Sequence, residues 1–325
     1  MHSDFEPSSQ MVDVVQFSDL HVGSTSYQGR LLANVVQYVN EHAPDVAVCC
    51  GDVTNRGRLR EFEKARKKLE ALEVPLLCVP GNRDAKNNGL FFYEKMFGAR
   101  THCAEIMGAT FLCCNTAISD LRQGYVGNFQ LHWLAKRLQQ CETTNRILVM
   151  HHHLVPVPDA GRETDVIMDA GDVLEMTQIF DATLVLCGDR HVPYAWVIGP
   201  TTFLCAGTAS SYKVRGDEGP SFNHVRISGD GKDLEVRTVD SATLEPHPEP
   251  IIVRKGGHTL QVRHRLTRIE HLLNSKLYES VDVEGALQFK PPCAVGAGSK
   301  GDGGTGEGNS RGTGRGANED LESGG

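Results

Sequence analysis

The chain has 325 residues, and 40% of them are hydrophobic, which is enough to build a sizeable core and excludes wholesale disorder. Its 33 Lys and Arg residues against 41 Asp and Glu residues give a formal net charge of −8, which disfavours nucleic acid as a partner. Residues 1–11 have no apolar signal core, and no run approaches the roughly 20 apolar residues of a membrane span. We therefore expect a cytoplasmic protein without a membrane span.

Short apolar runs alternate with amphipathic stretches from residue 12 to about residue 240. The runs predict buried strands at Val12–Phe17, Val46–Cys50, Leu76–Val79, Thr110–Cys114, Ile147–Met150 and Thr183–Cys187. The amphipathic stretches predict helices at Arg30–Asn40, Leu59–Leu72, Phe129–Gln140 and Asp172–Phe180. After Cys187 only strand patterns follow, at Tyr194–Ile198, Thr202–Cys205, Asn223–Ile227 and Leu234–Thr238. This order predicts an α/β (α+β layered) fold with a second, mostly antiparallel sheet.

The rest of the chain differs in composition from this main domain at residues 12–240. Residues 1–11 are expected to be a flexible N-terminus, and residues 294–325 a disordered Gly-rich tail. Residues 241–293 form an extension in which the apolar spacing of 266–277 predicts an amphipathic helix. That helix could dock on the main domain or serve as a surface for self-association or a partner, and the sequence leaves both open.

Polar side chains that can bind metal follow five of the predicted strands. They are Asp19 and His21, then Asp52, then Asn82, then His151, and finally Asp189 and His191. In open α/β sheets ligands bind outside the carboxyl ends of the strands, so we expect these side chains to gather at one edge. A mixed Asp, His and Asn set without thiolate suits divalent Mn, Fe or Zn, and two ions sharing a carboxylate is the economical arrangement.

These residues also match the motifs of a known family. The patterns D-x-H, G-D, G-N-H-D, a strand-ending H and G-H-x-H correspond to Asp19-Leu20-His21, Gly51-Asp52, Gly81-Asn82-Arg83-Asp84, His151 and Gly188-Asp189-Arg190-His191. Over residues 12 to about 228 the chain thus resembles the calcineurin-like metallophosphoesterases, and among them the bacterial class III cyclic nucleotide phosphodiesterases. The resemblance implies a four-layer αββα sandwich of two mixed sheets. It also implies phosphodiester hydrolysis, with cyclic nucleotides among the candidate substrates and a metal-bound hydroxide as nucleophile.

The resemblance further implies a role for each matched residue. The first metal would be bound by Asp19, His21, Asp52 and His191, and the second by Asp52, Asn82, His151 and Asp189. Either one or two divalent ions per chain are expected, as Mn²⁺, Fe²⁺/Fe³⁺ or Zn²⁺. His151 is preferred to His152 as the ligand because it comes first after its strand. Asn82, Arg83 and His152 are the candidate catalytic residues beside a small phosphoester substrate.

Two positions depart from the family pattern. Arg83 replaces a histidine that stabilises the transition state or protonates the leaving oxygen, and Asp189 replaces the first histidine of the last motif. Arginine can stabilise phosphate charge but does not release its proton near neutral pH. Asp189 could ligate the second ion, or it could pair with Arg83 and leave the second site empty. The chain could accordingly be an active phosphoesterase, or a weak or inactive metal-binding member that acts as a sensor or scaffold.

Overall fold

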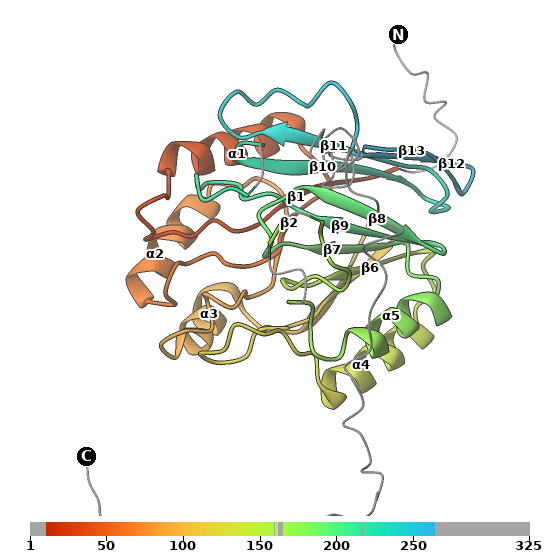
Figure 1. The fold of residues 1–325 in the computed structure, drawn as a ribbon, viewed down its shortest axis with the longest axis horizontal. Coiled ribbons are helices and arrows are strands. Elements are labelled where there is room, and N and C mark those ends of the chain that lie inside the picture. The colour runs from red at the N-terminus through yellow and green to blue at the C-terminus, as the bar shows by residue number, and fades with distance from the viewer. Residues whose placement is uncertain (1–10, 159, 162–164, 216–217, 264–325) are drawn as a thin grey trace, which may run out of the picture. The chain divides into compact units, whose positions relative to one another are not determined.

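Two mixed β-sheets lie face to face in the structure, and helices cover the outer face of each sheet (Figure 1). The computed structural model describes residues 11–158, 160–161, 165–215 and 218–263. One apolar core fills the space between the two sheets. A second core lies between the first sheet and its helices, and a third between the second sheet and its helices. The four-layer αββα sandwich that the family resemblance implied is therefore confirmed.

The first sheet has the strand order β13-β12-β11-β10-β1-β2-β3. Its strands are β1 (Met11–Phe17), β2 (Val46–Cys49), β3 (Leu76–Cys78), β10 (Ser221–Ser228), β11 (Leu234–Asp240), β12 (Ile252–Lys255) and β13 (His258–Val262). The helices on its outer face are α1 (Gly29–His42), α2 (Leu59–Leu69) and α3 (Gly89–Phe97). β1, β2 and β3 run parallel, so their carboxyl ends point the same way. Helix α1 packs here because Leu32, Val35 and Val39 recur on one face and are all buried.

The second sheet has the strand order β4-β5-β6-β7-β9-β8. Its strands are β4 (His102–Ile106), β5 (Ala109–Cys113), β6 (Asn145–Val149), β7 (Leu184–Cys187), β8 (Tyr194–Ile198) and β9 (Thr201–Cys205). The helices on its outer face are α4 (Asn128–Gln139) and α5 (Ala170–Ile179). The four strands β5, β6, β7 and β9 run parallel. Strand β6 is buried on both faces, with Ile147 in the central core and Leu148 against the helices.

The expectation that the strands after Cys187 form a sheet of their own is wrong. β8 and β9 complete the second sheet, whereas β10 and β11 join the first sheet beside β1. An apolar run shows that a segment is a buried strand, but it does not say which strand is its partner. The pairing of β1 with β10, for example, joins Val14 to Val225 across most of the described chain.

Four elements of the structure were not expected from the sequence: α3, β4, β12 and β13. The edge strands β4 and β13 are half-buried or exposed and so lack a buried apolar run. The turn between β12 and β13 did carry a signal, because Gly256 and Gly257 both have positive φ and such Gly pairs favour hairpins. The first sheet thus extends to Val262, beyond the expected boundary at residue 240.

The amphipathic helix expected at 266–277 and the Gly-rich tail lie outside the described residues. Within the described ranges, no helix is long and apolar enough to cross a membrane.

Candidate metal centre

The loops after β1, β2, β6 and β7 meet at one end of the sandwich. Asp19 N donates to Gly51 O at 3.0 Å, and Gly188 N donates to His151 O at 2.9 Å, which ties neighbouring loops together within each sheet. The His151 side chain connects the two sheets, since its Nδ1 lies 2.7 Å from Cys50 O. The side chains expected at one edge of one sheet therefore come from two sheets that meet across the sandwich, which corrects that expectation.

The backbone of these loops is strained at the residues that carry the candidate ligands. Asp19, His21, Asp52, Asp189 and His191 all have positive φ, between 51° and 64°. Non-glycine residues seldom adopt this region, and such strain costs of order 1–3 kcal/mol per residue when held in place. Strain concentrated at polar, buried side chains is typical of functional sites. The sequence showed no sign of it.

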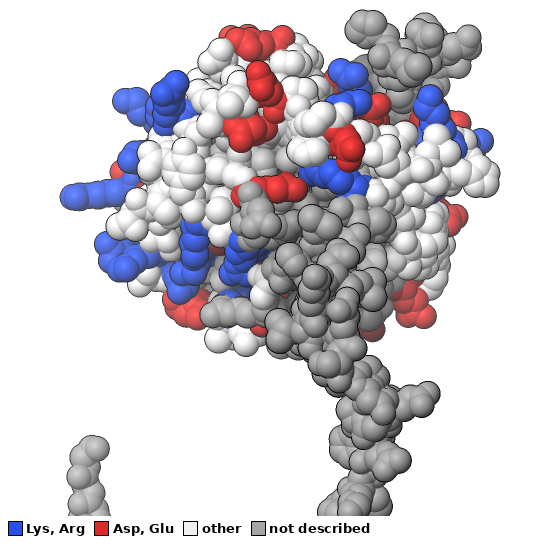
Figure 2. Space-filling model, turned by 45° about the horizontal axis from the view of Figure 1, so that its top comes forward, with Lys and Arg blue, Asp and Glu red and all other residues white. Residues whose placement is uncertain are grey.

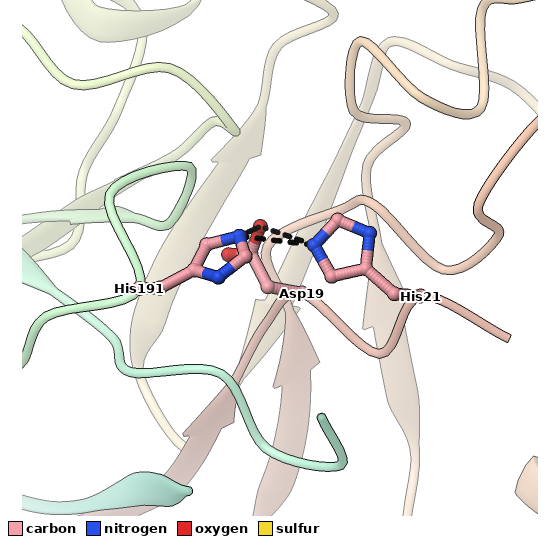
Figure 3. Close-up of side chains that lie close together, drawn as sticks. All are labelled: Asp19, His21 and His191. Atoms are coloured by element: carbon pink, nitrogen blue, oxygen red, sulfur yellow. Dashed lines mark hydrogen bonds and ion pairs between the residues drawn. The ribbon is translucent and has the colours of Figure 1, made fainter. Parts of the chain in front are cut away.

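Asp19, His21 and His191 form the first ligand group, in which all three side chains are buried and converge (Figure 3). His191 Nε2 lies 3.0 Å from Asp19 Oδ1, and His21 Nε2 lies 3.5 Å from the same oxygen. The two Nε2 atoms are 2.9 Å apart. The Nδ1 atom of His191 contacts the backbone oxygen of Lys213. That contact directs the Nε2 lone pair of His191 into the group, as in histidines that bind metal.

Asp19, Asp52 and His151 form the second ligand group, which shares Asp19 with the first. His151 Nε2 lies 3.4 Å from Asp52 Oδ1, while the other oxygen of Asp52, Oδ2, lies 3.9 Å from His21 Nε2. The carboxylate of Asp52 therefore faces both groups with different oxygens. The His151 bond to the Cys50 carbonyl leaves Nε2 directed at Asp52.

The chemistry of this donor set fits divalent cations. Asp19 Oδ1 and His151 Nε2 are buried and lie near other ligand atoms, yet neither makes a hydrogen bond of good geometry among the described residues. A buried polar atom without a partner is costly, and a cation bound between such atoms would remove the cost. Carboxylate and imidazole ligands together suit Mn²⁺, Fe²⁺ or Zn²⁺.

The electrostatics of the two groups agree with this fit. Burial raises the pKa of Asp52 to about 7. Burial by itself lowers the pKa of His151, but the Asp52 and Asp19 carboxylates outweigh it and raise that pKa to about 9. Burial lowers the pKa of His21 to about 4. Without a metal, the carboxylates therefore attract a proton to His151, and a divalent ion would compete for the same charge.

Close packing holds Asp52 in place. A Cβ added at Gly81 would lie 2.2 Å from Asp52 Oδ1, so only glycine fits beside that carboxylate. Asp84 fastens the two neighbouring loops, since its buried carboxylate accepts from the amides of Val53, Thr54 and Gly81 at 2.7–3.0 Å. Asp84 belongs to the G-N-R-D motif, yet this role was not expected from the sequence.

The segment that holds Asn82 and Arg83 borders the second ligand group through its backbone. Asn82 is buried, and the backbone amide of Arg83 donates to Asp52 Oδ1 at 2.7 Å. The hypothesis that Arg83 forms an ion pair with Asp189 is wrong. Within the described residues the ion-pair partners of Asp189 are His151, His153 and Arg190.

His152 does not join the two ligand groups. Its Nδ1 lies 2.8 Å from Thr116 Oγ1, and its Nε2 lies 3.0 Å from the carbonyl oxygen of Arg122. Burial lowers the pKa of His152 to about 3, so this side chain is neutral. Both ring nitrogens are thus engaged by the loop after β5, whereas the neighbouring His153 contacts Asp189. The three consecutive histidines were a signal that could have pointed to His153.

Comparison with known proteins identifies the family of the chain. Residues 12–193 match the family model for calcineurin-like phosphoesterases. The glycerophosphodiester phosphodiesterase GpdQ of Enterobacter lignolyticus is 25% identical over 199 residues, which cover 58% of this chain and 69% of that protein. The 3',5'-cyclic adenosine monophosphate phosphodiesterase CpdA of Escherichia coli K12 is 21% identical over 194 residues, covering 55% and 70%.

Solved structures show the same fold at low identity. A purple acid phosphatase from yellow lupin superposes with a TM-score of 0.58 at 14% identity, covering 74% of this chain and 53% of that chain. The structure of PhoD superposes with a TM-score of 0.57 at 10% identity, covering 78% and 72%. This chain spans about half the length of the lupin phosphatase chain. Because the family model covers more than half of the sequence, the protein belongs to the calcineurin-like phosphoesterases, a family of hydrolases that act on phosphoester bonds.

Proposed function

We propose that the protein is a divalent-metal-dependent phosphoesterase that hydrolyses phosphodiesters, and that small diesters such as cyclic nucleotides are the substrates to test first. The observation that carries the proposal is the pair of ligand groups that share Asp19, with the two oxygens of Asp52 directed one to each group. The relatives support the substrate class, since both GpdQ and CpdA are phosphodiesterases.

The residues of the chain have separate tasks in this proposal. Asp19, His21, Asp52 and His191 would hold one ion, and Asp52, His151, Asn82 and Asp189 a second ion. When bound, such ions activate water and neutralise charge on the phosphate. The Lys213 and Cys50 carbonyls orient His191 and His151, so the ligands are positioned before any ion arrives. Arg83 offers a fixed positive charge to a phosphate oxygen beside the second group.

The proposed site has no proton donor at position 83. Arg83 does not release its proton near neutral pH, and His152 is engaged on both nitrogens. Donation of a proton to a leaving oxygen contributes typically about 10²- to 10⁴-fold to a rate. We therefore expect turnover to depend steeply on the acidity of the leaving group, so that nitrophenyl diesters react far faster than alkyl or ribose diesters.

The proposal is tested with Mn²⁺-loaded protein and bis(4-nitrophenyl) phosphate. We expect turnover that a chelator abolishes and that Asp19→Ala removes, because Asp19 belongs to both ligand groups. Asp230→Ala is the matched control, since this carboxylate lies in the turn between β10 and β11 and its bonds within the described residues are to the nearby Ser228 and Lys232. Turnover that survives in the Asp19→Ala variant would contradict the proposal.

A non-catalytic metal-binding role is the second candidate. It is favoured by the replacement of family histidines at two positions, Arg83 and Asp189, both beside the second ligand group. Firm binding of Mn²⁺ without turnover of any nitrophenyl diester would support this sensor or scaffold role over the enzyme.

A further inference from the structure

Asp189 is held from two sides by residues that lie outside the two ligand groups. Its Oδ2 atom lies 3.5 Å from His153 Nδ1 and 3.7 Å from a terminal nitrogen of Arg190. Its other oxygen, Oδ1, lies 3.9 Å from His151 Nε2. One oxygen therefore lies within ion-pair distance of a guanidinium and an imidazole, and the other faces the second ligand group.

Arg190 is itself fixed in place. Its side chain is 1% exposed and is the largest fully buried side chain in the described residues. One terminal nitrogen donates to Ala160 O at 2.9 Å, and the other lies 3.8 Å from Asp165 Oδ2. Asp165 also contacts Arg122, in the loop after β5. The Arg190 side chain thus connects Asp189 with the segment after β6, and through Asp165 with the loop after β5.

We propose that Arg190 is a positioning residue for the second metal: together with His153 it fixes the carboxylate of Asp189 so that Oδ1 is presented beside His151 as a ligand. The inference rests on the proposed function, because it assumes that divalent ions bind at this centre. It explains how an aspartate can serve where the family pattern has a histidine. A carboxylate is shorter than an imidazole and rotates more freely, so it needs partners that fix its direction.

The alternative effect of Arg190 is electrostatic. A buried guanidinium close to the second group would repel a divalent ion, and removing it would then strengthen binding. For a neutral variant of similar length, loss of the positioning effect would weaken binding of the second ion, whereas loss of the repelling charge would strengthen it. Partners that orient a metal ligand typically contribute about 10- to 100-fold to metal affinity. We expect the positioning effect to dominate, because the Oδ2 atom that Arg190 contacts is the one turned away from His151.

The experiment is a titration of the full chain with Mn²⁺ by calorimetry, together with electron paramagnetic resonance, in which two coupled Mn²⁺ ions give a distinct spectrum. Arg190→Met keeps the length of the side chain but removes both its charge and its donors. Arg190→Lys keeps the charge but loses the planar fork that reaches Asp189 and Ala160 together. We expect both variants to weaken the second binding step about 10- to 100-fold, to lose the coupled spectrum, and to leave the first step unchanged.

Two further variants make the test specific. Arg215→Met is the matched control, because Arg215 donates to the same Ala160 carbonyl at 2.9 Å, and it should leave both binding steps unchanged. His153→Gln removes the other partner of Asp189 and should weaken the second step even if Arg190→Met does not fold.

The possible outcomes separate this inference from the proposed function. Tighter or unchanged second-step binding in Arg190→Met, or full rescue by Arg190→Lys, would overturn the positioning role alone. Binding of only one ion by the wild type would also overturn it, since Asp189 would then have no ion to ligate. Complete absence of Mn²⁺ binding by the wild type would contradict both the inference and the proposed function.

Discussion

The carboxylate of Asp84 offers a quantitative test of how the centre is built. Its Oδ1 atom accepts from the amide and hydroxyl of Thr54, both at 2.7 Å, and its Oδ2 atom accepts from the amides of Val53 and Gly81 at 3.0 and 2.9 Å. In Asp84→Asn the amide oxygen can replace only one of these two oxygens. If it takes the place beside Thr54, the new NH₂ group faces the amides of Val53 and Gly81, donor against donor.

The cost follows from these contacts. Two buried N–H groups without an acceptor cost about 1–3 kcal/mol each, or roughly 2–6 kcal/mol together. Burial raises the pKa of Asp84, so its four donors compensate its desolvation only in part. We therefore expect a loss of roughly 2–4 kcal/mol in the free energy of unfolding.

The assay is urea unfolding of the metal-free protein, followed by circular dichroism. The slope of the free energy of unfolding against urea concentration should be the same in variant and wild type. Asp120→Asn is the control, because that exposed carboxylate accepts a single bond from Asn87 N at 3.0 Å. Its stability should change by about 0.5 kcal/mol or less. An Asp84→Asn variant as stable as this control would refute the reasoning.

Three further predictions concern the same centre. Gly81→Ala should abolish Mn²⁺ binding, because the new Cβ would displace Asp52. Gly171→Ala should bind normally, because no atom lies within 4 Å of a Cβ at that position. Equal binding by both variants in calorimetry would contradict the steric argument. Mn²⁺ binding should release protons near neutral pH, and the affinity should rise as the pH increases from about 7 to about 9. The reason is that the ion needs both ligands deprotonated, while the pKa of Asp52 is raised to about 7 and that of His151 to about 9. Calorimetry in buffers of different ionisation enthalpy measures this release, and a pH-independent affinity would count against it. His151→Gln should lose the second Mn²⁺ ion, while His152→Gln should keep both ions and unfold at lower urea concentration, because His151, unlike His152, faces Asp52. Loss of the second ion in both variants would assign His152 to the centre.

The sequence by itself was sufficient to predict most strands and helices of the fold and the buried faces of some of them. Runs such as Val46–Cys50 and Thr183–Cys187 predict strands that are buried on both faces, and the structure has β2 and β7 there. The spacing of Leu32, Val35 and Val39 predicts the buried face of α1. These features are local, since a few neighbouring residues decide whether a segment can bury an apolar surface. The positions of ligand-type residues directly after strands could be read for the same reason.

Only the tertiary structure decided how those strands and side chains come together. The sequence did not reveal that the ligand loops belong to two sheets, nor that Asp52 faces both ligand groups. Nor did it show the left-handed backbone of Asp19 and His21, because that strain is imposed by the bonds between neighbouring loops.

The partner of Asp189 shows most clearly what the sequence could not predict. From the motif alone Arg83 was a reasonable partner, since its charge is opposite and it belongs to the same expected subsite. In the structure Asp189 instead contacts Arg190, its neighbour in sequence, and His153 from the loop after β6. A motif names the residue types that reach a site, but the direction of each side chain depends on the loops packed around it. For Asp189 those loops follow strands of the second sheet, and their contact with it arises only when that sheet has formed.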